Sequence, residues 1–216
     1  MRNHPWLWAL AVIVALALAL VAYRVCFVRP RFDPDAIAAA ETRMWQAYYA
    51  GDKREIGLQL MALLRSQYGL SLLDAQQVGE RFAGAAIKFK SARADYDTVV
   101  LPDLAQAYRR LRDLAGASFD PEATARAELA WWVARRTPGQ NSPEQVGDKI
   151  AELYAVLYGR SSPAFQEAGR LRAQAAHLRD LRGVRADWDK VHGLLRASYR
   201  SLQQAIQHEN STPGAG

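Results

Sequence analysis

The sequence of 216 residues contains two halves that resemble each other in register. Residues 32–45 and 119–132 are identical at eight of their fourteen positions, and the shared residues include Phe, Asp, Pro, Glu and Trp. Similarity at a constant spacing within one chain is the signature of a repeated structural unit. The body of the protein is therefore predicted to consist of two copies of one unit.

Three further pairs of blocks follow in the same order. Residues 68–71 match 158–161, 93–97 match 185–189, and 108–111 match 199–202. The spacing between partners changes at segments that resemble loops, where insertions are tolerated. The alternative is a chance likeness between two halves rich in Ala, Leu and Arg, but four ordered blocks that carry rare residues favour a duplication.

Capping signals divide each copy into four helices. Asp33-Pro34 and Asp120-Pro121 are typical helix starts, because Asp accepts from free backbone N–H groups and Pro fits the first turn. The second helices are predicted at 53–68 and 143–158, the third at 72–90 and 163–182, and the fourth begin near Asp95 and Asp187. Pro102 is expected to kink or restart the fourth helix of the first copy.

The predicted fold class is all-α, since no alternating run is long enough for a strand. Short loops favour antiparallel neighbours, so we expect two tandem four-helix repeats, residues 32–116 and 117–208, packed together. Residues 209–216 are expected to be disordered because of their composition.

An unbroken apolar or aromatic stretch from Trp6 to Tyr23 marks residues 1–31 as a predicted N-terminal membrane anchor and basic juxtamembrane segment. Its eighteen residues would span about 27 Å as a transmembrane helix, close to the hydrocarbon thickness of a bilayer. A cleaved signal peptide is the alternative. It is disfavoured because the apolar stretch continues past both Ala-x-Ala sites and the charged region before it is short.

Most of the formal charge of +6 lies beside this anchor. Residues 32–216 hold 24 basic and 22 acidic side chains, which argues against a nucleic-acid partner. Arg24, Arg29 and Arg31 are the candidate contacts to anionic lipid headgroups. Under the positive-inside rule, these arginines favour a single-pass protein of the plasma membrane with its body in the cytoplasm.

Two glutamates are the candidate functional residues. Glu41 shares a helix face with Trp45, and Glu128 occupies the matching place beside Trp132. A buried carboxylate needs a cation or several hydrogen-bond donors, or else it stays protonated. Arg109 and Arg200 are the candidate partners. Each follows a matched tyrosine, Tyr108 or Tyr199, and these tyrosines are candidate residues of the same cleft or ion-pair region.

These residues have two interpretations. In the structural one, each Glu forms a buried ion pair with an Arg and joins the first helix to the fourth. In the functional one, Glu41 and Glu128 line a cleft between the repeats for a small molecule, a lipid or a substrate. The structural interpretation is favoured, because a buried Glu–Arg pair needs no ligand to explain it.

The remaining motifs predict neither a metal nor a cofactor. Asp95 and Asp97, with the matched Asp187 and Asp189, resemble a metal-binding pair, but they stand where helices begin and capping explains them. One Cys excludes a multi-Cys site, no His has the spacing of a zinc protease, and phosphate-binding and nucleophile motifs are missing.

The leading hypothesis is therefore a membrane-anchored scaffold or protein-interaction module without enzymatic activity. Its expected partners are membrane lipids and either another protein or a second copy of the chain. The alternative hypothesis is a helical binding protein or enzyme whose cleft is lined by Glu41 and Glu128.

Overall fold

The structure is a computed structural model that describes residues 5–27 and 31–207. These residues form α-helices and one 3-10 turn, with no strand among them, so the predicted all-α fold class is confirmed. Within the first helix, the described side chains are those of residue 6 and residues 10–23. The predicted disorder of residues 209–216 falls outside the described part of the chain.

The helices follow one another through short connections. In chain order they are α1 (Pro5–Phe27), α2 (Pro34–Ala50), α3 (Lys53–Tyr68), α4 (Leu72–Ser91), α5 (Tyr96–Val99), α6 (Leu101–Ala115), α7 (Pro121–Arg136), α8 (Pro143–Tyr158), α9 (Pro163–Arg182), the 3-10 turn η1 (Gly183–Arg185) and α10 (Trp188–Gln207).

Side-chain caps explain where the helices begin. Asp33 accepts hydrogen bonds from the backbone N–H groups of Asp35 and Ala36 at the start of α2, and Asp120 caps α7 in the same way. Ser71, Ser142 and Ser162 cap α4, α8 and α9. Each cap satisfies a backbone donor that has no partner within the helix.

Pro102 has the predicted effect on the chain before α6. Helix α5 ends at Val99, Val100 separates it from α6, and Pro102 lies in the first turn of α6. Proline is tolerated there because the first turn does not use its missing N–H group.

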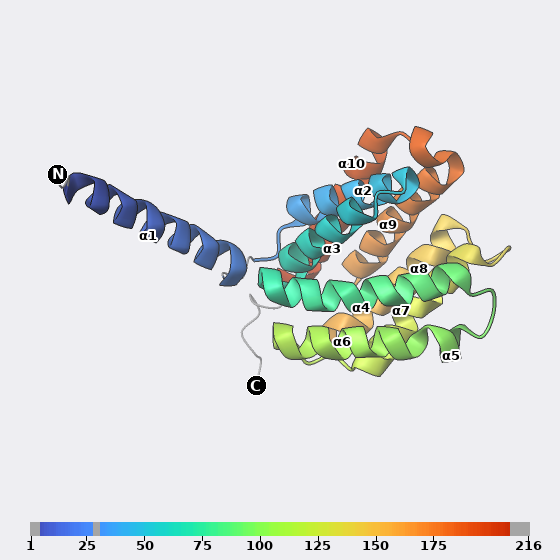
Figure 1. Cartoon of the computed structure of the whole chain (residues 1–216). Helices are drawn as coiled ribbons and strands as arrows, with labels where there is room; N and C mark the ends of the chain where they lie inside the picture. The colour runs from blue at the N-terminus through green and yellow to red at the C-terminus, as the bar shows by residue number, and fades with distance from the viewer. Residues whose placement is uncertain (1–4, 28–30, 208–216) are drawn as a thin grey trace.

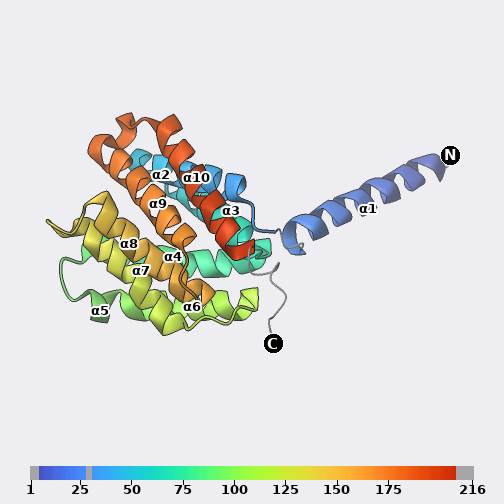
Figure 2. The ribbon, with the colours of Figure 1, turned by 180° about the vertical axis from the view of Figure 1, so that it is seen from behind.

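Helices α2 to α10 form a closed circuit (Figure 1, Figure 2). Each packs against the next along the chain, with the short α5 leading from α4 into α6, and α10 returns to pack against α2. One cluster of buried apolar side chains draws on residues from α2 to α4 and from α6 to α10. Residues 32–116 and 117–208 therefore share one core.

The packing of α8 on α9 depends on two glycines. A Cβ atom at Gly169 would lie 2.3 Å from the carbonyl oxygen of Gly147, so the two backbones meet without side chains between them. The matched position in the first half, Gly79, faces the side chains of Leu60 and Leu64 at 3.7 Å. The helix pair α3–α4 is therefore separated by side chains where α8–α9 is not.

Helix α1 projects away from the other helices and contacts α4 near its base (Figure 1). Its described apolar side chains are exposed, for example Leu16 at 65% and Leu18 at 64%. Among the residues that the structure describes, no helix combines the length and the apolar character needed to cross a membrane. The side chains of residues 7–9 and 24–27, which belong to the predicted anchor and its flank, lie outside the described part.

Candidate functional site

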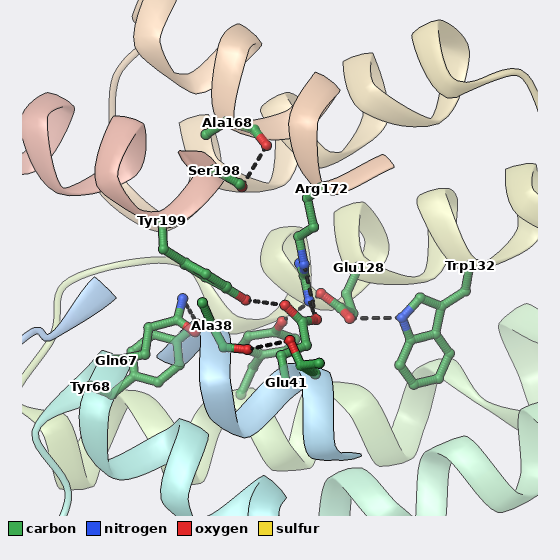
Figure 3. A network of polar contacts seen from close by, with 12 residues as sticks. Ala38, Glu41, Gln67, Tyr68, Glu128, Trp132, Ala168, Arg172, Ser198 and Tyr199 are labelled. Atoms are coloured by element: carbon green, nitrogen blue, oxygen red, sulfur yellow. Dashed lines mark hydrogen bonds and ion pairs between the residues drawn. The ribbon is translucent and has the colours of Figure 1, made fainter. Parts of the chain in front are cut away.

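Glu41 lies in the interior, where α2, α9 and α10 meet. Its side chain is 1% exposed. Arg172 on α9 donates to its Oε1 from Nε at 3.1 Å and from Nη2 at 2.7 Å, and the Tyr199 hydroxyl on α10 donates to its Oε2 at 2.6 Å (Figure 3). The ion pair offsets the cost of burying this carboxylate, and it joins three helices.

Glu128 has a different set of partners. The Tyr108 hydroxyl on α6 donates to its Oε2 at 3.0 Å, and the indole N–H of Trp132, one turn further along α7, donates to its Oε1 at 2.7 Å. Burial raises the pKa of this carboxyl above its ordinary value of 4.5, while the charge of Arg172 and these donors act in the opposite direction.

Arg172 connects the two carboxylates. Figure 3 shows its side chain descending from α9 toward both Glu41 and Glu128. Its guanidinium also lies over the ring of Trp131, 5.3 Å from the centroid, and its side chain is 15% exposed. The guanidinium of Arg172 therefore forms its ion pair with Glu41, and its positive charge also acts through space to lower the pKa of Glu128.

The structure brings together five of the residues singled out from the sequence. They are Glu41, Glu128, Tyr108, Tyr199 and Trp132. It does not bring in the two predicted arginines: Arg200 pairs with Asp35 at 3.0 Å, and Arg109 pairs with Glu122 at 3.3 Å. Both pairs are about half exposed. The predicted pairing of each Glu with the Arg that follows the matched Tyr is thus corrected, because successive helix positions point about 100° apart.

Trp45 lies apart from the two carboxylates. Its ring contacts the guanidinium of Arg179 on α9, whose carbon is 3.6 Å from the centroid. A cation over an indole face is an attractive arrangement, and it explains how a buried arginine is accommodated beside Trp45.

Arg172 is the residue that reasoning from the sequence missed. It lies at the position matched by Phe82 in the first half, at the spacing of 90 that relates the neighbouring blocks. Phe82 packs edge-on against Tyr108 with centroids 5.0 Å apart. An arginine in place of a core phenylalanine was the available signal, since a buried charge requires a buried counter-charge.

The hydrogen-bonding groups of the two carboxylates are satisfied within the protein. Every carboxylate oxygen of Glu41 and Glu128 accepts at least one hydrogen bond from a neighbouring side chain. Two cavities of the described structure lie elsewhere: one of about 330 Å³ is lined by Tyr68, Phe119 and Tyr158, and one of about 190 Å³ by Arg135 and His177, among others. Neither of these two cavities is lined by Glu41 or Glu128.

The structure also bears on the remaining residues singled out from the sequence. Asp187 caps the start of α10 by accepting from the backbone N–H of Lys190 at 3.1 Å. The capping prediction is wrong for Asp95, which precedes α5 in the left-handed conformation (φ 56°) and makes no side-chain cap hydrogen bond. No group of metal-ligating side chains occurs among the described residues. Of the candidate lipid contacts, Arg31 is exposed. Arg29 and the side chain of Arg24 fall outside the described part of the chain.

Comparisons with known proteins do not assign a function to this chain. No protein-family model matches the chain, and no match was found among curated proteins or among solved structures.

Proposed function

We propose that this protein is a single-pass membrane-anchored scaffold or interaction module, with a helical body made of two copies of a four-helix unit. The observation that carries the proposal is helix α1, whose described apolar side chains are exposed on a segment that projects from the body (Figure 1). An apolar helix that protein does not cover needs another apolar environment, and a lipid bilayer supplies one.

The sequence around α1 supports a bilayer as that environment. Residues 6–23 carry no charged side chain, and aromatic residues stand at both ends of this stretch. Aromatic rings favour the membrane interface, and basic residues on its cytoplasmic side favour a cytoplasmic body. Arg24, Arg29 and Arg31 would then lie at the headgroups of that leaflet.

Two observations support a duplicated body. The helices at matched positions have nearly equal lengths, such as α4 and α9 with 20 residues each. In addition, the Tyr199 hydroxyl of the second half binds Glu41 of the first, while the Tyr108 hydroxyl of the first half binds Glu128 of the second. Such a reciprocal exchange is what a two-fold relationship between two copies produces.

Exposed apolar side chains support an interaction role. Ile87, Leu181 and Val184 are 67%, 64% and 63% exposed, and they belong to the C-terminal ends of α4 and α9 and to η1. These ends lie at the part of the body away from α1 (Figure 1). Large exposed apolar side chains are among the residues that a surface for another protein or a second copy would use.

Two double variants of the full chain test the two parts of this proposal separately. Val14→Arg with Leu18→Arg places two charges in α1, at about 2.5–3.5 kcal/mol each in a membrane interior, and should release the protein from membranes under alkaline extraction. Ile87→Arg with Leu181→Arg adds the same charges to the body. That variant should stay in the membrane pellet but lose the chemical cross-links that the unmodified chain forms.

Each result has a contrary outcome. Release of the unmodified chain by alkaline extraction, or retention of the α1 variant, would refute the anchor. Cross-links that persist unchanged in the Ile87 and Leu181 variant would refute the interaction surface while leaving the anchor intact.

A further inference from the structure

Two arginines near the C-terminal ends of α7 and α9 share one carboxylate. Asp180 accepts a hydrogen bond from Nη2 of Arg135 at 3.0 Å and lies 3.3 Å from Nε of Arg179. It also accepts from the Tyr49 hydroxyl at 2.7 Å. Among these three charged groups, one positive charge is left without a counter-charge.

The two guanidinium groups also have unused donors. The Nε atoms of both Arg135 and Arg179 are buried, and neither makes a hydrogen bond within the described part of the protein. The Arg179 side chain is only 8% exposed. A buried donor without an acceptor costs about 1–3 kcal/mol, so such groups are usually satisfied by something.

Two familiar explanations account for only part of this arrangement. Arginine in the last turn of a helix is favoured by the helix dipole, and Arg135 and Arg179 both occupy last turns. The ring of Trp45 stacks under Arg179, and that of Trp131 lies 5.8 Å from Arg135. Neither effect supplies a hydrogen-bond acceptor or the missing negative charge.

Space for a small ligand lies beside these groups. A cavity of about 190 Å³ is lined by Arg135 and Asp180, by the polar side chains of Asn141 and His177, and by apolar residues of α8 and α9. Burial, followed by the charge of Arg135, lowers the pKa of Arg179 to about 10, while Asp180, Tyr49 and Glu41 act in the opposite direction.

We propose that this cavity binds a small oxyanion of the phosphate type, held by Arg135 with Asn141 and His177, while Arg179, which does not line the cavity, adds positive charge through its contact with Asp180. Guanidinium groups suit this role because their planar donors match the oxygens of such anions. The ligand is either a free phosphate compound or the phosphate of a lipid headgroup, and both present the same chemistry. The proposal does not depend on the membrane anchor or on the interaction surface.

The test is a titration of the full chain in non-ionic detergent with inorganic phosphate, at constant ionic strength maintained with chloride. Calorimetry and tryptophan fluorescence report binding, since Trp45 and Trp131 lie against the two arginines. We expect saturable binding, weakened at least about tenfold by Arg135→Gln and measurably by Arg179→Gln. Arg182→Gln is the matched control, because it removes an exposed arginine from the same last turn of α9.

Asp180→Asn gives an opposite and more specific result. Removing the shared carboxylate should strengthen phosphate binding several-fold, and phosphate should raise the melting temperature of this variant more than that of the unmodified chain. This readout also holds if an arginine variant fails to fold. A purely structural Asp180 would lower stability with no response to phosphate.

Vesicles of phosphatidic acid mixed with phosphatidylcholine identify the source of the oxyanion. If phosphatidic acid does not increase binding above that to vesicles of phosphatidylcholine alone, while inorganic phosphate binds, the ligand is a free phosphate compound. An increase with phosphatidic acid that is lost in Arg135→Gln but kept in Arg182→Gln assigns the headgroup. The proposal is overturned if neither probe binds saturably, or if Arg182→Gln weakens binding as much as Arg135→Gln.

Discussion

The hydroxyl of Tyr199 donates a hydrogen bond of 2.6 Å to Glu41, 158 residues away in the sequence, and so joins the last helix of the body to its first. The Tyr108 hydroxyl makes the same kind of bond to Glu128 across 20 residues, at 3.0 Å. The first bond joins α10 to α2, where the circuit of helices closes, and the second joins α6 to α7 within it.

Removing these hydroxyls should destabilise the body to different degrees. Tyr199→Phe should lower the free energy of unfolding by about 1.5–3 kcal/mol, because the acceptor Glu41 is buried and forms an ion pair with Arg172. Tyr108→Phe should cost about 0.5–1.5 kcal/mol, since Glu128 keeps its bond from Trp132 and has a raised pKa. Urea unfolding of the full chain in micelles, followed by circular dichroism, measures both. Equal losses would contradict the different states of the two carboxylates.

Arg172 should be more important for stability than either glutamate. Arg172→Met leaves the buried carboxylate of Glu41 without its cation and removes the positive charge that acts on Glu128, so it should cost about 3–5 kcal/mol. Glu41→Gln should cost less, because Arg172 still has Glu128 nearby (Figure 3). The same unfolding measurement checks the order. A smaller loss for Arg172→Met than for Glu41→Gln would show that Arg172 does not serve both groups.

Glu128 predicts a dependence of stability on pH. Its pKa is raised in the folded state by burial, so the folded protein keeps a proton that the unfolded chain releases above about pH 4.5. The contribution of Glu128 to stability should therefore be greatest below that pH and fall, by up to about 1.4 kcal/mol per pH unit, until the folded pKa is passed.

Glu128→Gln isolates this contribution. The difference in unfolding free energy between the variant and the unmodified chain should shift in favour of the variant as pH rises above 4.5. The exposed Glu122, in the first turn of the same helix, supplies the control, since Glu122→Gln removes a carboxylate without a burial effect. A difference that stays constant with pH would contradict the raised pKa.

The contact of α8 with α9 predicts opposite effects at two matched glycines. Gly169→Ala forces a Cβ to within 2.3 Å of a backbone oxygen and should cost about 1–3 kcal/mol or more through overpacking. Gly79→Ala meets only side chains at 3.7 Å and should stabilise α4 by about 0.5–1 kcal/mol. Thermal unfolding of both variants checks the sign. Equal destabilisation at both positions would contradict the different packing of the two helix pairs.

Much of the fold follows from local signals in the sequence. Asp33-Pro34, Asp120-Pro121 and the serine caps place the helix starts, because capping depends on residues within one turn. Pro102 predicts the break before α6 for the same reason. Such local signals could not predict which residues bond to Glu41. Whether Arg172 or Arg200 reaches it depends on how α9 and α10 are rotated against α2, and tertiary packing decides that rotation.

The candidate site, too, was predictable from the sequence only in part. Periodicity indicated that Glu41 and Glu128 face the interior, and the matched Tyr108 and Tyr199 pointed to their helices. Arg172 lies near both carboxylates only because of the way in which α9 packs within the folded body. That arrangement breaks the likeness of the two halves, so a comparison of one half with the other could not predict it.

Amide hydrogen exchange on the full chain reconstituted in phosphatidylcholine vesicles tests the central claim most directly. If α1 anchors a separately folded body, residues 10–23 exchange slowly in vesicles and much faster when lipid and detergent are removed, while α10 exchanges equally in both conditions. If residues 10–23 exchange at the rate of an unfolded peptide in vesicles, or stay equally protected without lipid, the membrane-anchor account is wrong.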